Sequence, residues 1–213
     1  MRTLFDEQLN LLHTSMVSMG TLCEDAIAMA AKALEEKDTV LAEKVPALAG
    51  QIDRKEREIE SLCMRLLLTQ QPVASDLRVI SAALKMVTDL ERIGNQSADI
   101  AEIVQTRASL MSMRSDTVHD MALAVIKMVN DSIDAFLHAD AGEAGAVIQY
   151  DDVVDRCFDT VKSELIDRLK SDASCREDVV DILMIAKYLE RIGDHAVNVA
   201  KWALFSLTGE WEE

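Results

Sequence analysis

The sequence contains an internal duplication that limits the folds available to it. Residues 85–101, KMVTDLERIGNQSADIA, return near the C-terminus within 186–200, AKYLERIGDHAVNVA. Matching residues are 99 positions apart, as Glu91 and Glu190 are (190 minus 91), and as Gly94 and Gly193 are. A repeat of this length indicates two copies of one structural unit. The two glycines each cost about 1 kcal/mol relative to alanine inside a helix, which indicates that another backbone or a small group approaches them closely.

Both halves are expected to be helical. Only two of the 213 residues are proline and seven are glycine, and apolar residues recur every three to four positions over long stretches. This period is typical of amphipathic helices. We therefore predict an all-α fold of two tandem three-helix bundles, in residues 1–108 and 109–213, with a linker at 107–116. The six long helices should cover about residues 4–37, 40–69, 75–106, 117–138, 141–170 and 175–207, with a kink or a delayed start of the second at Pro46.

A glutamate interrupts the apolar line of each repeated segment. Glu91 lies on this line in the first copy and Glu190 in the second, so each carboxylate is expected to be buried or half-buried and to need a partner. The adjacent Arg92 and Arg191 point about 100° away on the helix, so we expect the partner to come from another helix. The line in the first copy consists of Val73, Leu77, Ile80, Leu84, Val87, Glu91, Gly94, Ala98 and Ala101.

Acidic residues also recur at helical spacing in both halves. One helix of each half carries two carboxylates four positions apart, and the repeated segment adds a glutamate with a polar residue four positions later. Like charges one turn apart repel, and a cation that prefers oxygen ligands would relieve that repulsion. A solvated acidic face with arginine counter-ions is the alternative that spacing leaves open. The candidate metal ligands are Glu56, Glu60, Glu91, Asn95, Asp99, Asp152, Asp155, Asp159, Glu190 and Asp194.

Composition and motif content argue against several classes of function. A formal net charge of −16 argues against nucleic acid, whose binding depends on Lys and Arg, and disfavours direct adhesion to anionic lipid. The N-terminus lacks the pattern of a signal peptide and no apolar run approaches the roughly 18 residues of a membrane span, so we expect a cytoplasmic protein. The four cysteines occur singly, which favours reduced, buried thiols over disulfides or a zinc site. No Glu-x-x-His pair, catalytic dyad or phosphate-binding loop is found, so we expect no enzymatic activity.

Three segments resemble the motifs of a known family. PVASDLR at 72–78, DLERIGN at 89–95 and YLERIGDH at 188–195 resemble those of PhoU, the phosphate-specific transport system accessory protein family. The resemblance covers essentially the full chain, with the same order and repeat length. It implies two three-helix bundles, often dimeric, and a non-enzymatic negative regulator of phosphate uptake and phosphate-regulon signalling. Such a regulator is an adaptor between the ATPase of the phosphate ABC transporter and a phosphate-sensing histidine kinase, and it meets the membrane only through partners.

The same resemblance implies metal binding through an E(D)xxxD motif in each repeat. Iron, manganese, magnesium and zinc are the metals we consider. Asn95 departs from the aspartate of the motif and leaves the first half one charge short, so we expect the second half to bind metal more tightly. A metal-storage or metal-dependent helical carboxylate protein is the alternative function. The motif maps onto Glu56 with Glu60, Asp155 with Asp159, Glu91 with Asn95, and Glu190 with Asp194.

Overall fold

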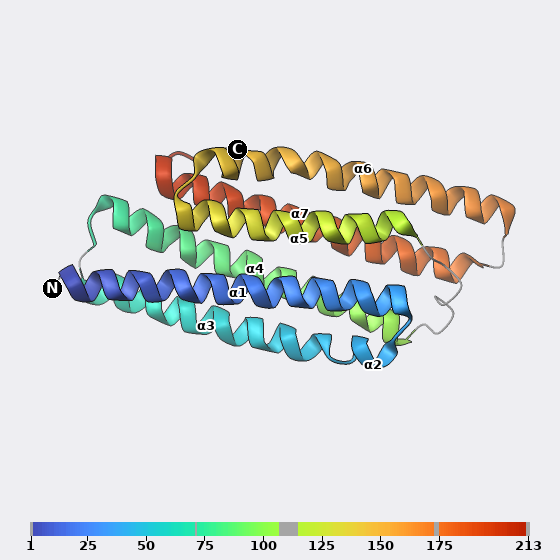
Figure 1. The fold of residues 1–213 in the computed structure, drawn as a ribbon, viewed down its shortest axis with the longest axis horizontal. Helices are drawn as coiled ribbons and strands as arrows, with labels where there is room; N and C mark the ends of the chain where they lie inside the picture. The colour runs from blue at the N-terminus through green and yellow to red at the C-terminus, as the bar shows by residue number, and fades with distance from the viewer. Residues whose placement is uncertain (1, 71, 107–114, 173–174, 212–213) are drawn as a thin grey trace.

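A computed structural model of the chain describes residues 2–70, 72–106, 115–172 and 175–211, and within them the fold is all-helical (Figure 1). Six long helices and one short helix form two similar halves in the described residues, so the predicted fold class is confirmed. The predicted boundary between residues 108 and 109, and most of the predicted linker, lie outside the described residues. The helices are α1 (Arg2–Glu36), α2 (Thr39–Ala42), α3 (Val45–Gln70), α4 (Ala74–Thr106), α5 (Asp116–His138), α6 (Ala141–Ser171) and α7 (Arg176–Thr208).

Equivalent caps set the first helix junction of each half. The Asp38 carboxylate accepts a hydrogen bond from the Leu41 backbone N–H, and the Asp140 carboxylate accepts two from the first turn of α6. An aspartate in this position satisfies N–H groups that have no partner within the helix. The residues before the caps, Lys37 and Ala139, adopt left-handed φ angles of 61° and 55°. The chain therefore leaves one helix and enters the next in the same way in both halves.

The two halves differ by three residues near the start of α3. The caps Asp38 and Asp140 are 102 positions apart (140 minus 38), whereas the later repeated segments are 99 positions apart. In the first half the chain forms the single turn α2 and then restarts as α3 at Val45, with Pro46 in its first turn. Proline is tolerated there because its missing N–H has no acceptor within the helix. Of the kink or delayed start predicted at Pro46, the structure shows the delayed start, and α6 runs unbroken through the equivalent region.

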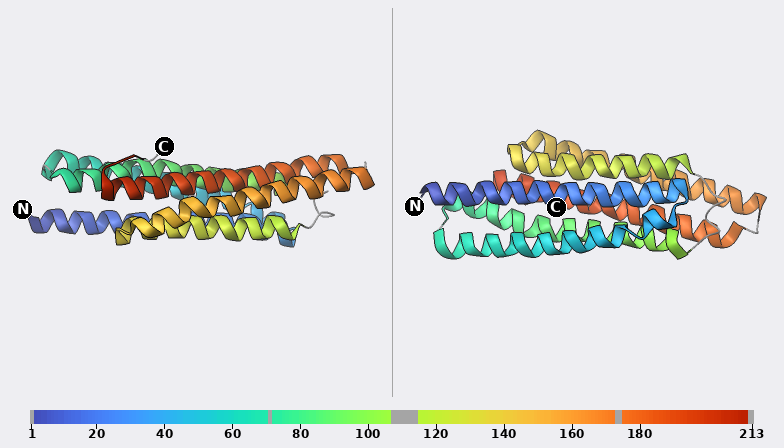
Figure 2. Two further views of the ribbon diagram at one scale, coloured as in Figure 1. Left: turned by 90° about the horizontal axis from the view of Figure 1, so that it is seen from above. Right: turned by 60° about the horizontal axis from the view of Figure 1, so that its bottom comes forward.

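Helices α4 and α7 pack antiparallel against each other at the centre of the molecule (Figures 1 and 2). α1 and α5 contact each other and complete a central group of four helices, while α3 packs on α1 and α4, and α6 packs on α5 and α7. The apolar residues of both halves form one continuous core. The end of α3 and the start of α4 lie at the opposite end of the molecule from the end of α6 and the start of α7 (Figure 1). In the described part of the chain, no helix is long and apolar enough to cross a membrane.

A buried polar link joins the two halves across this central contact. His195 of α7 and Asp89 of α4 lie 2.9 Å apart, Nδ1 to Oδ1, and their side chains are 10% and 13% exposed. An ionised carboxylate can only accept, so the imidazole Nδ1–H donates this hydrogen bond. Asn198 Nδ2 donates to the same Asp89 oxygen at 3.3 Å. Nearer the end of α7, Arg78 Nε donates to the Ser206 carbonyl oxygen at 3.4 Å.

The apolar line of α4 divides into a buried centre and an open edge. The line consists of two rows in which residues are seven positions apart. The first row is buried and consists of Ile80, Val87, Gly94 and Ala101. In the second row Leu77 is exposed, and Leu84, Glu91 and Ala98 are half-buried. Positions seven apart lie on almost the same face of a helix, so the second row follows the edge of the contact with α3. The prediction that Val73 and Leu77 are buried is wrong, because Val73 and Leu77 lie at the tip of the α3–α4 hairpin and are 66% and 45% exposed.

All four cysteines are free thiols, as predicted, but the predicted burial is wrong for Cys157 and Cys175, which are half-buried. Cys23 and Cys63 are buried, and burial raises the pKa of the Cys63 thiol to about 12. The Cys23 thiol donates to the Leu90 carbonyl oxygen at 3.4 Å, which ties α1 to α4. Buried thiols of this kind stay protonated at neutral pH and behave as small apolar side chains.

Candidate metal-binding acidic clusters

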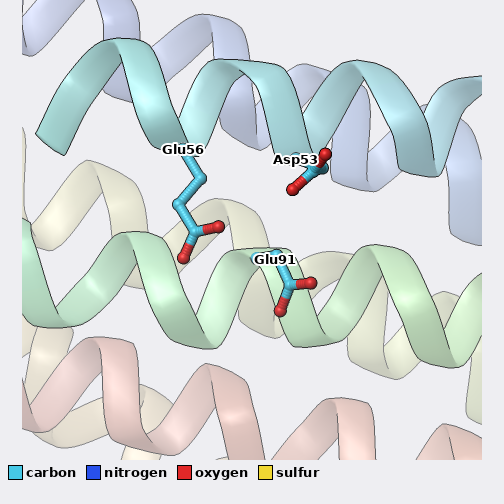
Figure 3. Close-up of side chains that lie close together, drawn as sticks. All are labelled: Asp53, Glu56 and Glu91. Carbon is cyan, nitrogen blue, oxygen red and sulfur yellow. The ribbon is translucent and has the colours of Figure 1, made fainter. Parts of the chain in front are cut away.

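The first acidic cluster consists of Asp53 and Glu56 on α3 and Glu91 on α4 (Figure 3). A carboxylate oxygen of each residue lies within 4.8 Å of one from each of the other two, and all three residues are half-buried. Asp53 and Glu56 share a face of α3 because they are three positions apart. Figure 3 shows the Glu56 side chain extending from α3 toward α4, where Glu91 lies. Among the described residues, no other group of three or more acidic, histidine or cysteine side chains converges this closely.

Negative charge exceeds positive charge in this cluster. Burial raises the pKa of the Glu56 carboxyl, and the carboxylates of Glu91, Glu60 and Asp53 raise it further, while Arg57 opposes them. Arg57 donates from Nη2 to both Asp53 oxygens at 2.9 and 3.0 Å. One guanidinium therefore faces several carboxylates. A cation that binds oxygen ligands would relieve the remaining repulsion.

Glu91 and Glu190, which interrupt the apolar lines of α4 and α7, have their partners on their own helices. Asn95 Nδ2 donates to Glu91 Oε1 at 2.6 Å, and the Lys187 ammonium forms a short ion pair with Glu190. The prediction that each partner comes from another helix is wrong. Residues three or four positions apart face each other on a helix, and both glutamates have a donor at such a position.

The second acidic cluster lies on α6 and α7. Asp151 and Asp155 of α6 lie near Glu190 and Asp194 of α7. The pKa of the Asp151 carboxyl is raised to about 6, first by burial and then by these three carboxylates and Asp152. The pKa of the Asp194 carboxyl is also raised, mainly by burial and by Glu190. The two halves thus place acidic clusters at equivalent positions.

The second cluster contains cations that the first cluster does not have. Lys187 pairs with Glu190, and its ammonium nitrogen lies 5.5 Å from the centroid of the Phe158 ring. Lys162 lies 5.3 Å from the same centroid and pairs with Asp159 at 3.0 Å. A metal ion that binds Glu190 must therefore compete with the Lys187 ammonium. The equivalent residues of the first half, 99 positions earlier, are Thr88, Ile59 and Cys63.

The structure brings only part of the predicted ligand set together. Glu56 and Glu91 converge, and Asp155, Glu190 and Asp194 lie near one another around Asp151. Asp99 lies apart from the first cluster: burial and Glu102 raise the pKa of its carboxyl, and Arg191 lowers it. The predicted ligands whose residues are exposed to solvent are Glu60, Asn95, Asp152, Asp155, Asp159 and Asp194.

The sequence prediction did not include Asp53 and Asp151. Asp53 is three positions before Glu56, a spacing that places two carboxylates on one helix face as well as the spacing of four does. Asp151 lies 99 positions after Ile52, so a carboxylate stands where the first copy has a buried apolar residue. Comparing the buried positions of the two copies would have found Asp151.

Three carboxylates and no nitrogen or sulfur ligand suit a hard cation such as Mg²⁺, Mn²⁺ or iron better than zinc. Asp53, Glu56 and Glu91 supply too few protein ligands to fill the six positions of these ions, so water would complete the set. The expectation that the second half binds more tightly stays a prediction. The Lys187 ammonium beside Glu190 argues for the opposite order.

Comparison with known proteins places this arrangement in a family. The PhoU domain matches residues 16–104 and again residues 118–203. The chain belongs to the PhoU family. It is 34% identical over 217 residues to the phosphate-specific transport system accessory protein PhoU homolog of Clostridium acetobutylicum, covering 98% of this chain and 96% of that one. It is 37% identical over 207 residues to the PhoU homolog of Pseudomonas aeruginosa, covering 96% and 86%.

Solved structures of PhoU proteins share the fold. The crystal structure of PhoU from Pseudomonas aeruginosa superposes with a TM-score of 0.89 at 35% identity, covering 97% of this chain and all of that one. The phosphate transport system regulatory protein PhoU from Streptococcus pneumoniae superposes with a TM-score of 0.90 at 29% identity, covering 98% and 99%. This chain is accordingly an accessory and regulatory PhoU protein of a phosphate transport system, from a family that is not enzymatic.

Proposed function

We propose that this chain is a negative regulator of phosphate uptake and of phosphate-regulon signalling. It acts as an adaptor between the ATPase of a phosphate ABC transporter and a phosphate-sensing histidine kinase. The observation that carries the proposal is the similarity over nearly the whole chain to phosphate-specific transport system accessory proteins. The charge of −16 supports it, since an acidic surface suits docking on basic patches of partner proteins. We further propose a cytoplasmic homodimer that reaches the membrane only through these partners, with repeat domains at 1–108 and 109–213.

Metal binding is part of the proposal. The first cluster, Asp53, Glu56 and Glu91, would hold iron, manganese or magnesium, with zinc as a weaker fit to an oxygen-only set. The ion would link α3 to α4, because the three carboxylates come from both helices. Its role is to neutralise mutually repelling carboxylates and thereby to stabilise the hairpin on which they lie.

A deletion strain tests the regulatory role. Removing the gene, with the transporter intact, should leave a phosphate-starvation reporter switched on in high phosphate, and the unmodified gene should restore repression. Reporter output that stays low in the deletion strain would contradict the proposal. A strain that carries the Glu91→Gln variant tests separately whether the acidic cluster contributes to repression.

The convergent carboxylates also favour a second candidate function, a metal-storage or metal-dependent helical carboxylate protein. The discriminating measurement is turnover. Storage requires the purified protein to accumulate many ions per chain, and catalysis requires a redox turnover, such as Fe²⁺ oxidation, or a hydrolytic turnover. A regulator needs only a fixed, small number of bound ions. Metal analysis together with an Fe²⁺ oxidation assay separates the two functions.

A further inference from the structure

The tip of the α3–α4 hairpin exposes four large apolar side chains, which we call the apolar tip. Met64 and Leu68 lie one turn apart near the end of α3, while Val73 directly precedes α4 and Leu77 lies in its first turn. Leu68 and Val73, at 77% and 66%, are the most exposed large apolar residues in the described part of the chain. Apolar surface gathered in one place in this way is typical of an interaction site.

The second copy of the repeat is an internal control for what the fold requires at this tip. Residues 66–75, LLLTQQPVAS, carry no charge in a chain that is 28% charged, whereas the equivalent residues 165–174, LIDRLKSDAS, carry four. The same helical hairpin therefore forms with charged residues at its tip, and folding does not explain the apolar tip. At the positions equivalent to Met64, Leu68, Val73 and Leu77 the second copy has Ser163, Asp167, Asp172 and Arg176, all exposed.

Carboxylates lie behind the apolar tip on both helices, two on α3 and one on α4. On α3 a row with a spacing of four leads back from Leu68 through Met64 and Glu60 to Glu56. On α4 a row with a spacing of seven leads from Leu77 through Leu84 to Glu91. Twelve residues separate Leu68 from Glu56, which is about 18 Å along the helix axis. A partner that covers both the apolar tip and these carboxylates needs apolar side chains against the tip and positive charge against the carboxylates.

We infer that the apolar tip and the acidic rows behind it form a docking surface for a partner protein that has an apolar cleft flanked by Lys and Arg side chains. The inference rests on the proposed adaptor role, which requires a contact with the transporter ATPase or with the kinase. A bilayer suits the surface less well, because anionic headgroups would repel the neighbouring carboxylates. A symmetric contact with a second copy would place the same acidic rows near each other.

The test uses the full chain and replaces two tip residues with those of the second copy. The Leu68→Asp, Val73→Asp double variant should fold, because Asp167 and Asp172 occupy the equivalent positions, and circular dichroism and the melting temperature check this. Leu123→Asp, at an exposed position of α5, is the matched control.

The probes are the purified transporter ATPase and the purified cytoplasmic part of the kinase from the same genome. The double variant should bind at least one probe at least about tenfold more weakly, with no change for the control.

Further measurements separate the remaining outcomes. Glu60→Lys should weaken the same complex and reduce its sensitivity to salt, because one attraction to the basic partner is lost. Equal binding by the unmodified chain and the double variant overturns the inference and leaves the proposed function standing. Failure of the unmodified chain to bind either probe contradicts the adaptor role and this inference with it. Two other results would also overturn the inference. Flotation with phosphatidylcholine and phosphatidylglycerol vesicles that is lost in the double variant would assign the tip to lipid. A dimer that becomes a monomer in the double variant would assign the tip to a second copy.

Discussion

Asp151 packs against Gly193 in the place where Ile52 packs against Gly94. A Cβ added to Gly193 would lie 3.2 Å from Asp151 Oδ1, and one added to Gly94 would lie 2.8 Å from Ile52 Cδ1. The close approach predicted for both glycines is confirmed, but the prediction of a backbone or a small group is wrong, because the nearest atoms belong to the Ile52 and Asp151 side chains. The duplication has thus kept the geometry of the helix contact and changed its chemistry, because an apolar contact in one half is part of a carboxylate cluster in the other.

Replacing Asp151 with asparagine should stabilise the protein at neutral pH. The folded-state pKa of about 6 lies above the ordinary value of 3.8, so the folded state holds the proton more firmly than the unfolded state does. Ionisation of Asp151 therefore costs stability as the pH rises from about 4 through about 6, and that cost persists above pH 6. Urea unfolding in EDTA should show the Asp151→Asn variant gaining stability at pH 7.5 and gaining less at pH 4.

Asp152→Asn is the matched control, since Asp152 is the exposed neighbour of Asp151 on α6. It should change the stability little at either pH. A stability difference between the Asp151→Asn variant and the unmodified protein that does not vary with pH would contradict the argument.

Metal binding in the first half should depend on Asp53 and Glu91. Removing either carboxylate takes away one of three converging oxygen ligands, so Asp53→Asn and Glu91→Gln should each lower the affinity for Mn²⁺ by about tenfold or more. Titration calorimetry on protein stripped with EDTA measures this. Glu60→Gln should have a smaller effect, because Glu60 is exposed and outside the converging group. An unchanged affinity in the Glu91→Gln variant would exclude the first cluster as the main site.

Removing Lys187 should strengthen metal binding in the second half. The Lys187 ammonium pairs with Glu190, and Lys187→Met removes this competing cation while keeping an apolar stem beside Phe158. The variant should bind more Mn²⁺ per chain than the unmodified protein, and adding Asp194→Asn should reverse the gain. Lys162→Met is the control, because Lys162 pairs with the exposed Asp159 instead. Mn²⁺ binding that does not change in the Lys187→Met variant would show that Lys187 does not act as a competitor.

Alanine substitution at two helical glycines should have opposite effects on stability. Gly94→Ala places a Cβ 2.8 Å from Ile52 Cδ1 and 3.3 and 3.4 Å from Ile52 Cγ2 and Cβ. The fully buried Ile52 must therefore shift as a whole, so the variant should lose about 1–3 kcal/mol. Gly145→Ala meets nothing within 4 Å and should gain up to about 1 kcal/mol from helix propensity. Denaturant unfolding of both variants measures the difference. A Gly94→Ala variant as stable as Gly145→Ala would mean that the α3–α4 contact is looser than described.

The sequence by itself determined the helices, their caps and the two-fold repetition of the structure. These features depend on interactions between residues close in the chain, such as the Asp38 and Asp140 caps and the apolar period of three to four. Spacing within one helix also placed Glu91 and Glu190 at the edge of a buried face. Such spacing is set by the helix geometry alone, so it can be predicted without knowing the neighbours.

The tertiary structure decided which of these residues meet. Whether Glu91 faces Asp53 or Glu60, whether Val73 is covered or exposed, and that His195 reaches Asp89 across 106 positions all depend on the rotation and axial register of one helix against another. Those quantities result from the packing of many side chains over the whole core, and a rotation of one helix by a few tens of degrees would bring a different set of carboxylates together. The periodicity of a single helix contains no information on that rotation.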